Sequence, residues 1–266
     1  NNGKYNMVTS TGIKNFKLGN SLFNLATAIG IAEANNDVVV LPEDYRFAPF
    51  FNIPKEWLKK DISFVVEEGE GPFHYTPIPY TKDMNINGYF QSEKYFKHAK
   101  DKVQEIITVT DKVKSGIQDQ INIIRSEHSI SLHVRRGDYL NYPNIHPTPN
   151  QDYYKEAIEY IVNETKKTDI EIFVFSDDIQ WCVDNLFSLA KINGIKKVNF
   201  VSDNENYEDL HLMSICNHQI TANSSFSWWA AWLNTYKNKI VVAPNNWFGP
   251  QGPDPKDLVP ETWKKI

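Results

Sequence analysis

The segment 129–138 (SISLHVRRGD) carries the side chains best suited to chemistry. Apolar and polar residues alternate over 130–135, which predicts a β-strand with one apolar face. Arg135 and Arg136 stand at its carboxyl end, followed by Gly137, where the chain can turn sharply. Adjacent arginines are costly to bury without an anion, and open α/β sheets bind ligands at the carboxyl ends of their strands. We interpret the pair as a clamp for a diphosphate; the alternative is a pair bridged to carboxylates of the chain itself.

A second anion-binding feature is predicted at the start of a helix over 226–233. Ser224 and Ser225 precede this helix, and the unpaired backbone N–H groups of a helix start favour an anion. Plain N-capping by these serines is the alternative. His133 shares a strand face with Arg135 and could donate to a phosphate or a sugar; otherwise it is a hydrogen-bonded core histidine.

The acidic residues give less specific signals. Asp177 and Asp178 follow a predicted strand, and adjacent residues of a strand point in opposite directions, so a shared metal would need a special turn. Helix capping is therefore expected first, contact with the ligand second and a metal last; we include Asp178 among the ligand-binding candidates. Asp209 lies near the start of a predicted helix, and its carboxylate could accept two hydrogen bonds from a guanine edge. The alternative for Asp209 is a solvated helix surface.

Two further sets of residues are expected in the core. Trp228 and Trp232 are four residues apart and face one way, so they and Trp229 favour core packing over stacking on a ligand. Cys182 and Cys216 sit among apolar residues without metal or redox spacing, which predicts buried free thiols.

The composition is that of a soluble globular protein. The chain has 266 residues, 41% hydrophobic and 23% charged, with a formal net charge of −5, enough for one large or two small domains. The acidic balance argues against a nucleic-acid-binding protein. No stretch approaches the roughly 20 apolar residues of a membrane span, and the low cysteine content indicates a reducing, cytoplasmic setting. Because the chain starts without Met, membrane association through a partner or a missing upstream segment stays open.

The second half of the chain alternates regularly between strands and helices. This alternation predicts a parallel, Rossmann-like sheet covered by helices on both faces, in a C-terminal lobe over 126–266. Polar clusters follow four of its strands, and the carboxyl ends of parallel strands share one edge. The predicted strands are 130–135, 171–175, 197–201, 219–222 and 240–243, and the predicted helices 152–164, 179–190, 207–216 and 226–233.

The first 125 residues are less regular and predict a second lobe. Asn20 is placed to cap a helix that runs to about residue 35, and prolines punctuate the segment 42–80, which we expect to be loops around short elements. A cleft between two lobes is the expected place for a ligand. The other expected elements are strands at 7–9, 38–41, 62–66 and 85–90 and helices at 93–107 and 111–124.

At these residues the chain resembles the α-1,2-fucosyltransferase family, glycosyltransferase family 11. It is more distantly similar to protein O-fucosyltransferases and core α-1,6-fucosyltransferases. The chain departs from the family pattern at Lys17, Ser21 and Asn24. The matching pieces are 18–23 (LGNSLF), 133–139 (HVRRGDY), 153–158 (YYKEAI), 175–178 (FSDD) with 181–182 (WC), 209–218 (DLHLMSICNH) and 223–232 (NSSFSWWAAW).

The resemblance implies an α/β, GT-B-like fold of two lobes, in which residues 1–125 form the acceptor side. It also implies GDP-fucose as donor, inversion at the anomeric carbon with no metal or other cofactor, and a galactose-terminated glycan as acceptor. The donor-binding residues it implies are Arg135 and His133 on the β-phosphate side with Arg136 in support, Asp209 at guanine, Ser224, Ser225 and Phe226 at the phosphates and nucleoside, and Gly19 and Asn20 from the first lobe.

Fucosyl transfer would release GDP with growing negative charge, which arginines and a helix start can stabilise. We therefore expect Arg135 to be catalytic. The acceptor hydroxyl must also lose a proton, and Asp138 is our candidate base, with His146 a weaker one; alternatively, Asp138 holds the arginines in place. The rival functions are a transferase for another nucleotide sugar and a non-catalytic nucleotide- or carbohydrate-binding module. Acceptor choice would depend on segments 42–85 and 139–150.

Overall fold

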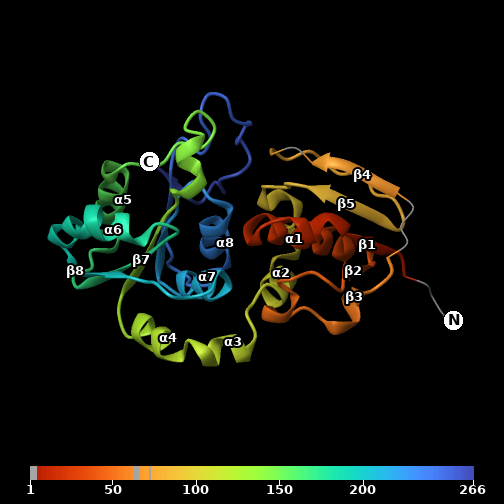
Figure 1. Ribbon diagram of the computed structural model, residues 1–266, viewed down its shortest axis with the longest axis horizontal. Coiled ribbons are helices and arrows are strands. Elements are labelled where there is room, and N and C mark those ends of the chain that lie inside the picture. The colour runs from red at the N-terminus through yellow and green to blue at the C-terminus, as the bar shows by residue number, and fades with distance from the viewer. Residues whose placement is uncertain (1–4, 63–65, 72) are drawn as a thin grey trace. The chain divides into compact units, whose positions relative to one another are not determined.

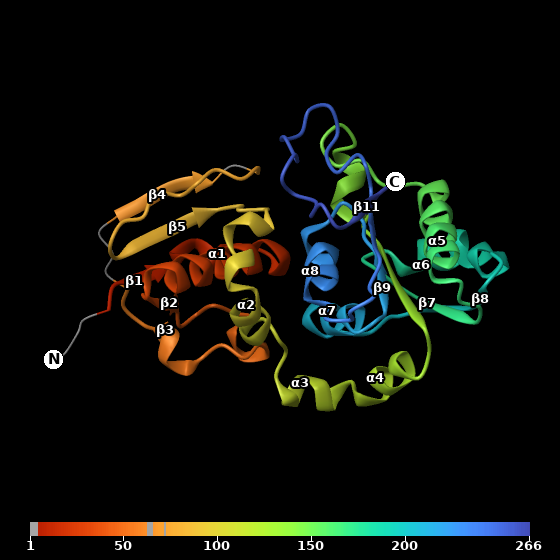
Figure 2. The same ribbon diagram turned by 180° about the vertical axis from the view of Figure 1, so that it is seen from behind.

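The computed structural model describes residues 5–62, 66–71 and 73–266, which form two compact units. The first unit comprises the chain up to Thr110 together with Asp254–Pro260, and the second comprises Asp111–Pro253 and Glu261–Ile266. Figures 1 and 2 show the parallel sheet of each unit from opposite sides. Residues 111–125, which we expected in the first lobe, belong to the second unit. Across the described ranges, no helix combines the length and the apolar character that spanning a bilayer requires.

The first unit contains a parallel five-stranded sheet of order β3-β2-β1-β5-β4. Helix α1 (Leu18–Asn35) contacts β1, β2 and β5, because apolar residues such as Leu22, Leu25 and Ile29 recur at helical spacing and are buried. The returning segment is held by Asp257, which accepts from the Tyr75 backbone N–H (3.0 Å). The strands are β1 (Met7–Thr9), β2 (Val38–Pro42), β3 (Leu58–Lys59), β4 (Val66–Gly71) and β5 (Met84–Gly88).

The start of α1 differs from the prediction. The helix begins at Leu18 with Lys17 as N-cap residue, and no side chain caps it. Asn20 is not the cap because its Oδ1 accepts from Gln91 Nε2 (2.8 Å) instead.

Packing also breaks the two helices predicted over 93–107 and 111–124. The first is replaced by two 3₁₀ turns and a short α2, because Phe96 leaves helical geometry (φ −144°) and buries its ring against Phe23. The second is divided into α3 and α4 at Ile117, which is buried. The observed elements are η4 (Glu93–Tyr95), η5 (Lys97–Ala99), α2 (Lys100–Ile106), α3 (Asp111–Gly116) and α4 (Gln118–Arg125).

The proline-rich segment 42–80 forms short elements between loops, as predicted. Two 3₁₀ turns, η2 (Ala48–Phe50) and η3 (Lys55–Trp57), precede the short β3. Residues 63–65 of the strand expected over 62–66 lie outside the described residues, and the described strand β4 begins at Val66.

The second unit contains the predicted parallel sheet, of order β11-β10-β9-β6-β7-β8. Its strands are β6 (Ser129–Val134), β7 (Ile170–Ser176), β8 (Ile195–Phe200), β9 (His218–Ile220), β10 (Val241–Ala243) and β11 (Lys264–Lys265). Its helices are α5 (Gln151–Thr165), α6 (Ile179–Leu186), α7 (Asn206–Ser214) and α8 (Ser225–Leu233), with 3₁₀ turns η6 (Gly137–Asn141) and η7 (Phe187–Lys191). The elements predicted after residue 126 are therefore confirmed, apart from shifts at their ends and the 3₁₀ turn η7 that replaces the last part of the helix predicted over 179–190.

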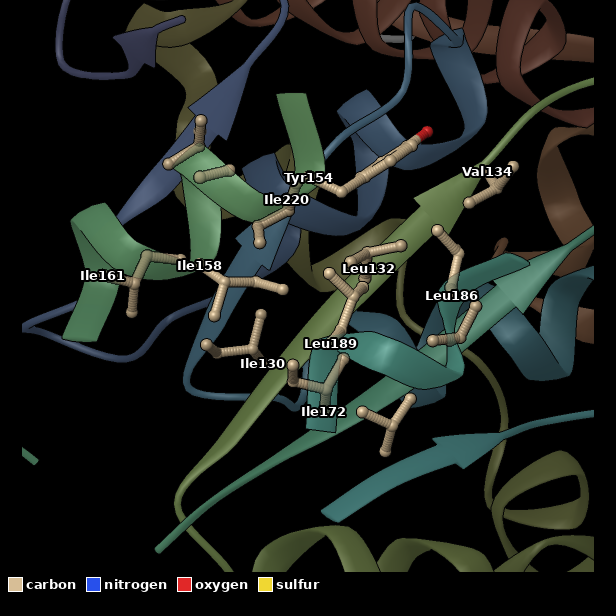
Figure 3. Close-up of a cluster of buried hydrophobic side chains, with 14 of the residues drawn as sticks. Ile130, Leu132, Val134, Tyr154, Ile158, Ile161, Ile172, Leu186, Leu189 and Ile220 are labelled. Atoms are coloured by element: carbon tan, nitrogen blue, oxygen red, sulfur yellow. The ribbon is translucent and has the colours of Figure 1, made fainter. Parts of the chain in front are cut away.

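Helices cover both faces of this sheet. On one face Ile130 and Leu132 of β6 pack against Ile158 and Ile161 of α5 (Figure 3). On the other face α7 contacts β6 and β7, and the His133 ring of β6 meets the Phe226 ring of α8. All six residues of β6 are consequently buried.

The predictions for the tryptophans and cysteines are confirmed. Trp228, Trp229 and Trp232 are at most 3% exposed and contact one another in the core, with the Trp228 and Trp232 rings stacked at 9°. Cys182 and Cys216 are buried free thiols.

The strand order of the second unit fixes where a ligand can bind. β6 pairs with β7 on one side and β9 on the other, so the order reverses between β6 and β9. Open α/β sheets bind ligands in the crevice outside the carboxyl ends of the strands at such a point. The residues after these two strands are the arginine pair and Asn223–Ser225.

Candidate active site

Arg135 is held by carboxylates on two segments. Its guanidinium donates to Asp177 Oδ2, which follows β7 (2.5 Å), and to Asp138 Oδ1 in η6. The same guanidinium lies over the Tyr139 ring, 4.9 Å from its centroid. These contacts hold the Arg135 guanidinium against the segments that follow β6 and β7.

Arg136 is held by Asp177 and Asp178, which follow β7. Its backbone N–H donates to Asp177 Oδ1 (2.9 Å), and its Nε donates to Asp178 Oδ2 (3.4 Å). Its guanidinium lies 4.0 Å from the centroid of the Trp181 ring. Bridging to the chain's own carboxylates, the alternative to the diphosphate clamp, is thus the arrangement in the structure. The side chains of Arg135 and Arg136 nevertheless keep 20% and 19% of their surface exposed.

Gly137 allows this close packing. Its φ is +23°, and a Cβ at this position would overlap Asp177 Oδ2. A side chain here would push apart Arg135 and its counter-charge.

The adjacent aspartates divide their work, as expected for residues that point in different directions. Asp177 accepts from both arginines, whereas Asp178 accepts from Arg136 Nε and caps α6 by accepting from the Trp181 N–H (3.2 Å). The capping expectation is confirmed for Asp178. In the part of the chain that the structure describes, no three His, Cys, Asp or Glu side chains are grouped so that they could hold a metal ion.

The start of α8 lies beside the segment after β6 that carries Arg135 and Arg136, which we call the arginine loop. Ser224 is its N-cap residue and accepts from the Phe226 N–H (3.3 Å), so N-capping is confirmed for Ser224. Ser225 is the first helical residue and is half-buried. The Tyr139 hydroxyl donates to the Asn223 carbonyl (3.2 Å), which ties the loop after β6 to the turn that opens α8.

Asn223 fixes that turn further. Its Nδ2 donates to the carbonyls of Pro147 (2.6 Å) and Trp247 (3.1 Å). One amide therefore joins the start of α8 to two loops at the same edge of the sheet.

His133 is a neutral core histidine. It is 4% exposed, and burial, together with the charge of Arg135, lowers its imidazole pKa to about 3. Its Nδ1 has no hydrogen-bond partner among the described residues. A contact of His133 with a phosphate or a sugar would therefore be made by a neutral imidazole.

Asp209 is a half-buried carboxylate with a fixed orientation. Its Oδ1 accepts from Asn204 Nδ2 (3.0 Å), and the Asn204 amide exchanges two hydrogen bonds with the Gln120 amide. Burial raises the pKa of Asp209 to about 6, and the Asn204 hydrogen bond opposes this rise. The solvated helix surface that we gave as the alternative does not describe it.

The predicted site residues fall in both units. Gly19 and Asn20 lie in the first turn of α1 in the first unit. The other predicted residues, which include Arg135, Asp138 and Asp209, lie in the second unit.

Tyr139, Trp181 and Asn223 were not predicted as residues of this site. Asp177 was considered as a cap, a ligand contact or a metal ligand, but not as the partner of both arginines. Asp177 and Tyr139 are adjacent to predicted residues, but their contacts depend on side-chain directions across loops. The position of Trp181, three residues after the capping Asp178, was the only available signal for its contact with Arg136.

The chain matches known proteins of one family. The model of Glycosyl transferase family 11 matches residues 55–264. An alpha-1,2-colitosyltransferase of Escherichia coli is 36% identical over 185 residues, 67% of this chain and 61% of that protein. The E. coli O-antigen biosynthesis glycosyltransferase WbnK is 35% identical over 182 residues, 66% of this chain and 58% of that protein. The chain thus matches about three fifths of the length of these two relatives.

More distant relatives cover more of the chain. The galactoside alpha-(1,2)-fucosyltransferase 2 of Oryctolagus cuniculus is 24% identical over 256 residues, 89% of this chain and 69% of that protein. Among solved structures, POFUT1 in complex with GDP has a TM-score of 0.56 at 11% identity, covering 88% of this chain and 96% of that one. NodZ alpha-1,6-fucosyltransferase soaked with GDP-fucose has a TM-score of 0.53 at 15% identity, covering 86% and 93%.

The structural likenesses confirm the predicted fold, α/β and GT-B-like with two parallel sheets. The family match extends over most of the chain and includes the arginine loop, Asp209 and the start of α8. The chain therefore belongs to glycosyltransferase family 11.

Proposed function

We propose that the chain is an inverting α-1,2-fucosyltransferase that moves L-fucose from GDP-fucose to the 2-hydroxyl of a terminal galactose on a glycan, without a metal. The observation that carries the proposal is the convergence of Arg135, Arg136 and the capped start of α8 at the switch point of the second sheet. Membership of family 11 and the names of its relatives support the sugar and the linkage.

Donor binding would exchange one counter-charge of Arg135 for another. The Asp177 side chain is 26% exposed and also accepts from the Arg136 backbone, whereas the Asp138 side chain is 53% exposed. Asp177 is therefore the structural partner, and Asp138 is the one that a diphosphate oxygen would replace. The fork of a guanidinium matches phosphate geometry, so the replacement keeps Arg135 in place.

The same groups would stabilise the leaving GDP. As the bond from fucose to the β-phosphate breaks, negative charge grows on the phosphate oxygens. Arg135, supported by Arg136, and the N–H groups at the start of α8 are positioned before the reaction, which is how such groups lower a barrier.

Release of Asp138 from Arg135 would make its carboxylate available for the proton of the acceptor hydroxyl. Donor binding would thus prepare the base. His146 is the weaker candidate: its ring stacks on Tyr139 at 4.3 Å, and burial lowers its pKa.

Guanine recognition would fall to Asp209, whose orientation is set by Asn204. Ser225, Phe226 and Asp178 would contact the phosphates and the nucleoside. Gly19 and Asn20 are the donor-binding candidates that belong to the first unit. These roles follow the family resemblance position by position.

The test is a transfer assay with GDP-fucose and lactose, with the product linkage determined by NMR. We expect a fucosyl-α-1,2-galactoside and inhibition by GDP but not by UDP or ADP. Absence of GDP release with every galactoside, despite tight GDP binding, would instead indicate a non-catalytic binding module.

A second candidate is transfer of another sugar from the same nucleotide. It is favoured by the 36% identity to an alpha-1,2-colitosyltransferase. Parallel assays with GDP-fucose and with the colitosyl analogue of this donor decide between them through the ratio of kcat/KM values.

A further inference from the structure

Three aromatic side chains gather at the carboxyl-terminal edge of the sheet in the first unit. Phe16 follows β1, Tyr89 directly follows β5, and Phe73 follows β4. The Phe73 and Tyr89 rings stack with centroids 4.1 Å apart and planes at 21°, and the Phe16 ring lies 6.0 Å from Tyr89 at 58°. All three residues are half-buried. We refer to Phe16, Phe73 and Tyr89 as the aromatic platform.

The platform lies at the switch point of the first sheet. In the order β3-β2-β1-β5-β4, the chain proceeds outward from β1 through β2 to β3, whereas β4 and β5 lie on the other side. The strand order therefore reverses between β1 and β5, which run parallel (Figure 1). As in the second unit, the crevice outside these strand ends is where a ligand is expected.

Side chains of β5 fix the loop that carries Phe16. Asn85 Oδ1 accepts from the Thr11 N–H (2.9 Å), and Asn87 Oδ1 accepts from the Gly12 N–H (2.8 Å). Gly12 packs so closely on Asn87 that a Cβ would come within 2.5 Å of its Oδ1. These contacts hold the segment before Phe16 against β5.

An amide pair accompanies the platform. Gln91, two residues after Tyr89, donates from Nε2 to Asn20 Oδ1 (2.8 Å), and Asn20 lies four residues after Phe16. Aromatic rings and amides at one sheet edge are a typical lining of small-molecule sites. The negative face of an aromatic ring attracts positively polarised C–H groups, which one face of a galactopyranose ring presents, while amides can bond its hydroxyls.

We propose that the aromatic platform binds the galactose ring of the acceptor. This inference rests on the proposed function, which assigns the donor nucleotide to the second unit. It places acceptor recognition on Phe16 and Tyr89, outside the segments 42–85 and 139–150 that the sequence suggested, with Phe73 as a contribution from the first of these.

The experiment compares Tyr89→Leu and Phe16→Leu with the wild-type chain. We expect the KM for lactose at saturating GDP-fucose to rise about tenfold in both variants, while the affinity for GDP by calorimetry stays within about twofold of wild type. Tyr89→Phe, which keeps the ring, should have a KM closer to wild type than Tyr89→Leu. The matched control is Tyr80→Leu: Tyr80 is 41% exposed in the same unit, and its hydroxyl bonds Asp37 just before β2.

An unchanged lactose KM together with a lower Tm in both leucine variants would overturn the proposal, because the rings would then only hold the loops together. If the wild-type chain transfers no fucose, the proposed function fails, but saturation-transfer NMR with lactose still tests the platform. A saturation-transfer signal on lactose that is seen with the wild type, lost with Tyr89→Leu and kept with Tyr80→Leu supports binding of lactose to the aromatic platform. No saturation transfer in the wild type overturns it.

Discussion

Arg135 has two carboxylate partners whose surroundings differ. Asp177 is the more buried and also accepts from the backbone of Arg136, whereas more than half of the Asp138 side chain is exposed. This difference indicates that Asp177 positions Arg135, whereas Asp138 is the partner that a diphosphate oxygen would replace. The two aspartates can therefore be separated by substitutions that change the charge but hardly the volume.

We expect Asp177→Asn to raise the KM for GDP-fucose at least about tenfold, because it removes the charge that positions Arg135 and so weakens its charge-assisted contacts. Asp138→Asn should bind GDP no more weakly than wild type, since it removes a competitor for Arg135, but should lose about 10²–10⁴ in kcat. Steady-state kinetics and GDP calorimetry measure both. Asp138→Asn with full kcat would reduce this residue to a support for Arg135.

The raised pKa of Asp209, about 6 through burial, predicts a pH dependence of GDP affinity. Above pH 6 the carboxylate is charged and can accept from guanine; below it, protonation removes this acceptor. We expect the affinity for GDP in wild type to fall relative to that in Asp209→Asn as the pH drops from 7 to 5. The comparison cancels the titration of the phosphate itself, and a pH-independent affinity ratio would contradict the assignment.

The same pKa has a consequence for stability. A carboxyl whose pKa is higher in the folded than in the unfolded chain costs stability at pH values above the folded pKa. This cost disappears as the pH falls from about 6 to below 3.8. Asp209→Asn should therefore raise the free energy of unfolding at pH 8, by up to about 3 kcal/mol, and change it little at pH 4. Urea titrations at the two pH values check the difference.

At the scale of elements, the second unit could be predicted and parts of the first could not. Strands β6 to β10 are short apolar runs separated by helical patterns, and each local signal agrees with the tertiary structure. Between residues 93 and 125 the local helical signal conflicts with packing, since Phe96 and Ile117 are buried at the expense of helix continuity. The cap assigned to Asn20 failed for a related reason, because its side chain is used by Gln91.

Two helical glycines test whether packing or propensity dominates. Gly30 lies inside α1, and a Cβ there would stand 2.5 Å from the backbone oxygen of Tyr95; a Cβ at Gly116 in α3 would meet nothing within 4 Å. Alanine gains up to about 1 kcal/mol in helix propensity at either site. We expect Gly30→Ala to destabilise the chain by about 1–3 kcal/mol and Gly116→Ala to be neutral or stabilising. Thermal unfolding gives the sign of each stability change. Equal changes in the two variants would show that the contact of a Cβ at Gly30 with Tyr95 is relieved easily.

For the whole molecule, the sequence predicted the fold and gave carboxylate bridging of the arginines as an alternative, but it did not identify Asp177 as their main counter-charge. The element pattern predicts a parallel sheet whose strand carboxyl ends share one edge, but it does not predict that β6 and β9 are neighbours. The pairing of Arg135 with Asp177 depends on loop conformations, including the positive φ of Gly137, which the pattern does not encode.

The proposed function assigns the charge of the leaving diphosphate to protein groups and not to a metal. We expect turnover with GDP-fucose to be unchanged by EDTA and not raised by Mn²⁺, because Arg135, Arg136 and the start of α8 supply the positive potential. A strong requirement for Mn²⁺ would instead support a metal site at Asp177 and Asp178.

In the proposed mechanism, Arg135 binds the diphosphate of the donor. Calorimetric titration with GDP and with guanosine, on wild type and on Arg135→Ala, tests it most directly, with circular dichroism confirming that the variant is folded. We expect wild type to prefer GDP over guanosine strongly and Arg135→Ala to lose about 100-fold of this preference, with its guanosine affinity unchanged. If the variant keeps the full preference for GDP, Arg135 does not bind the diphosphate.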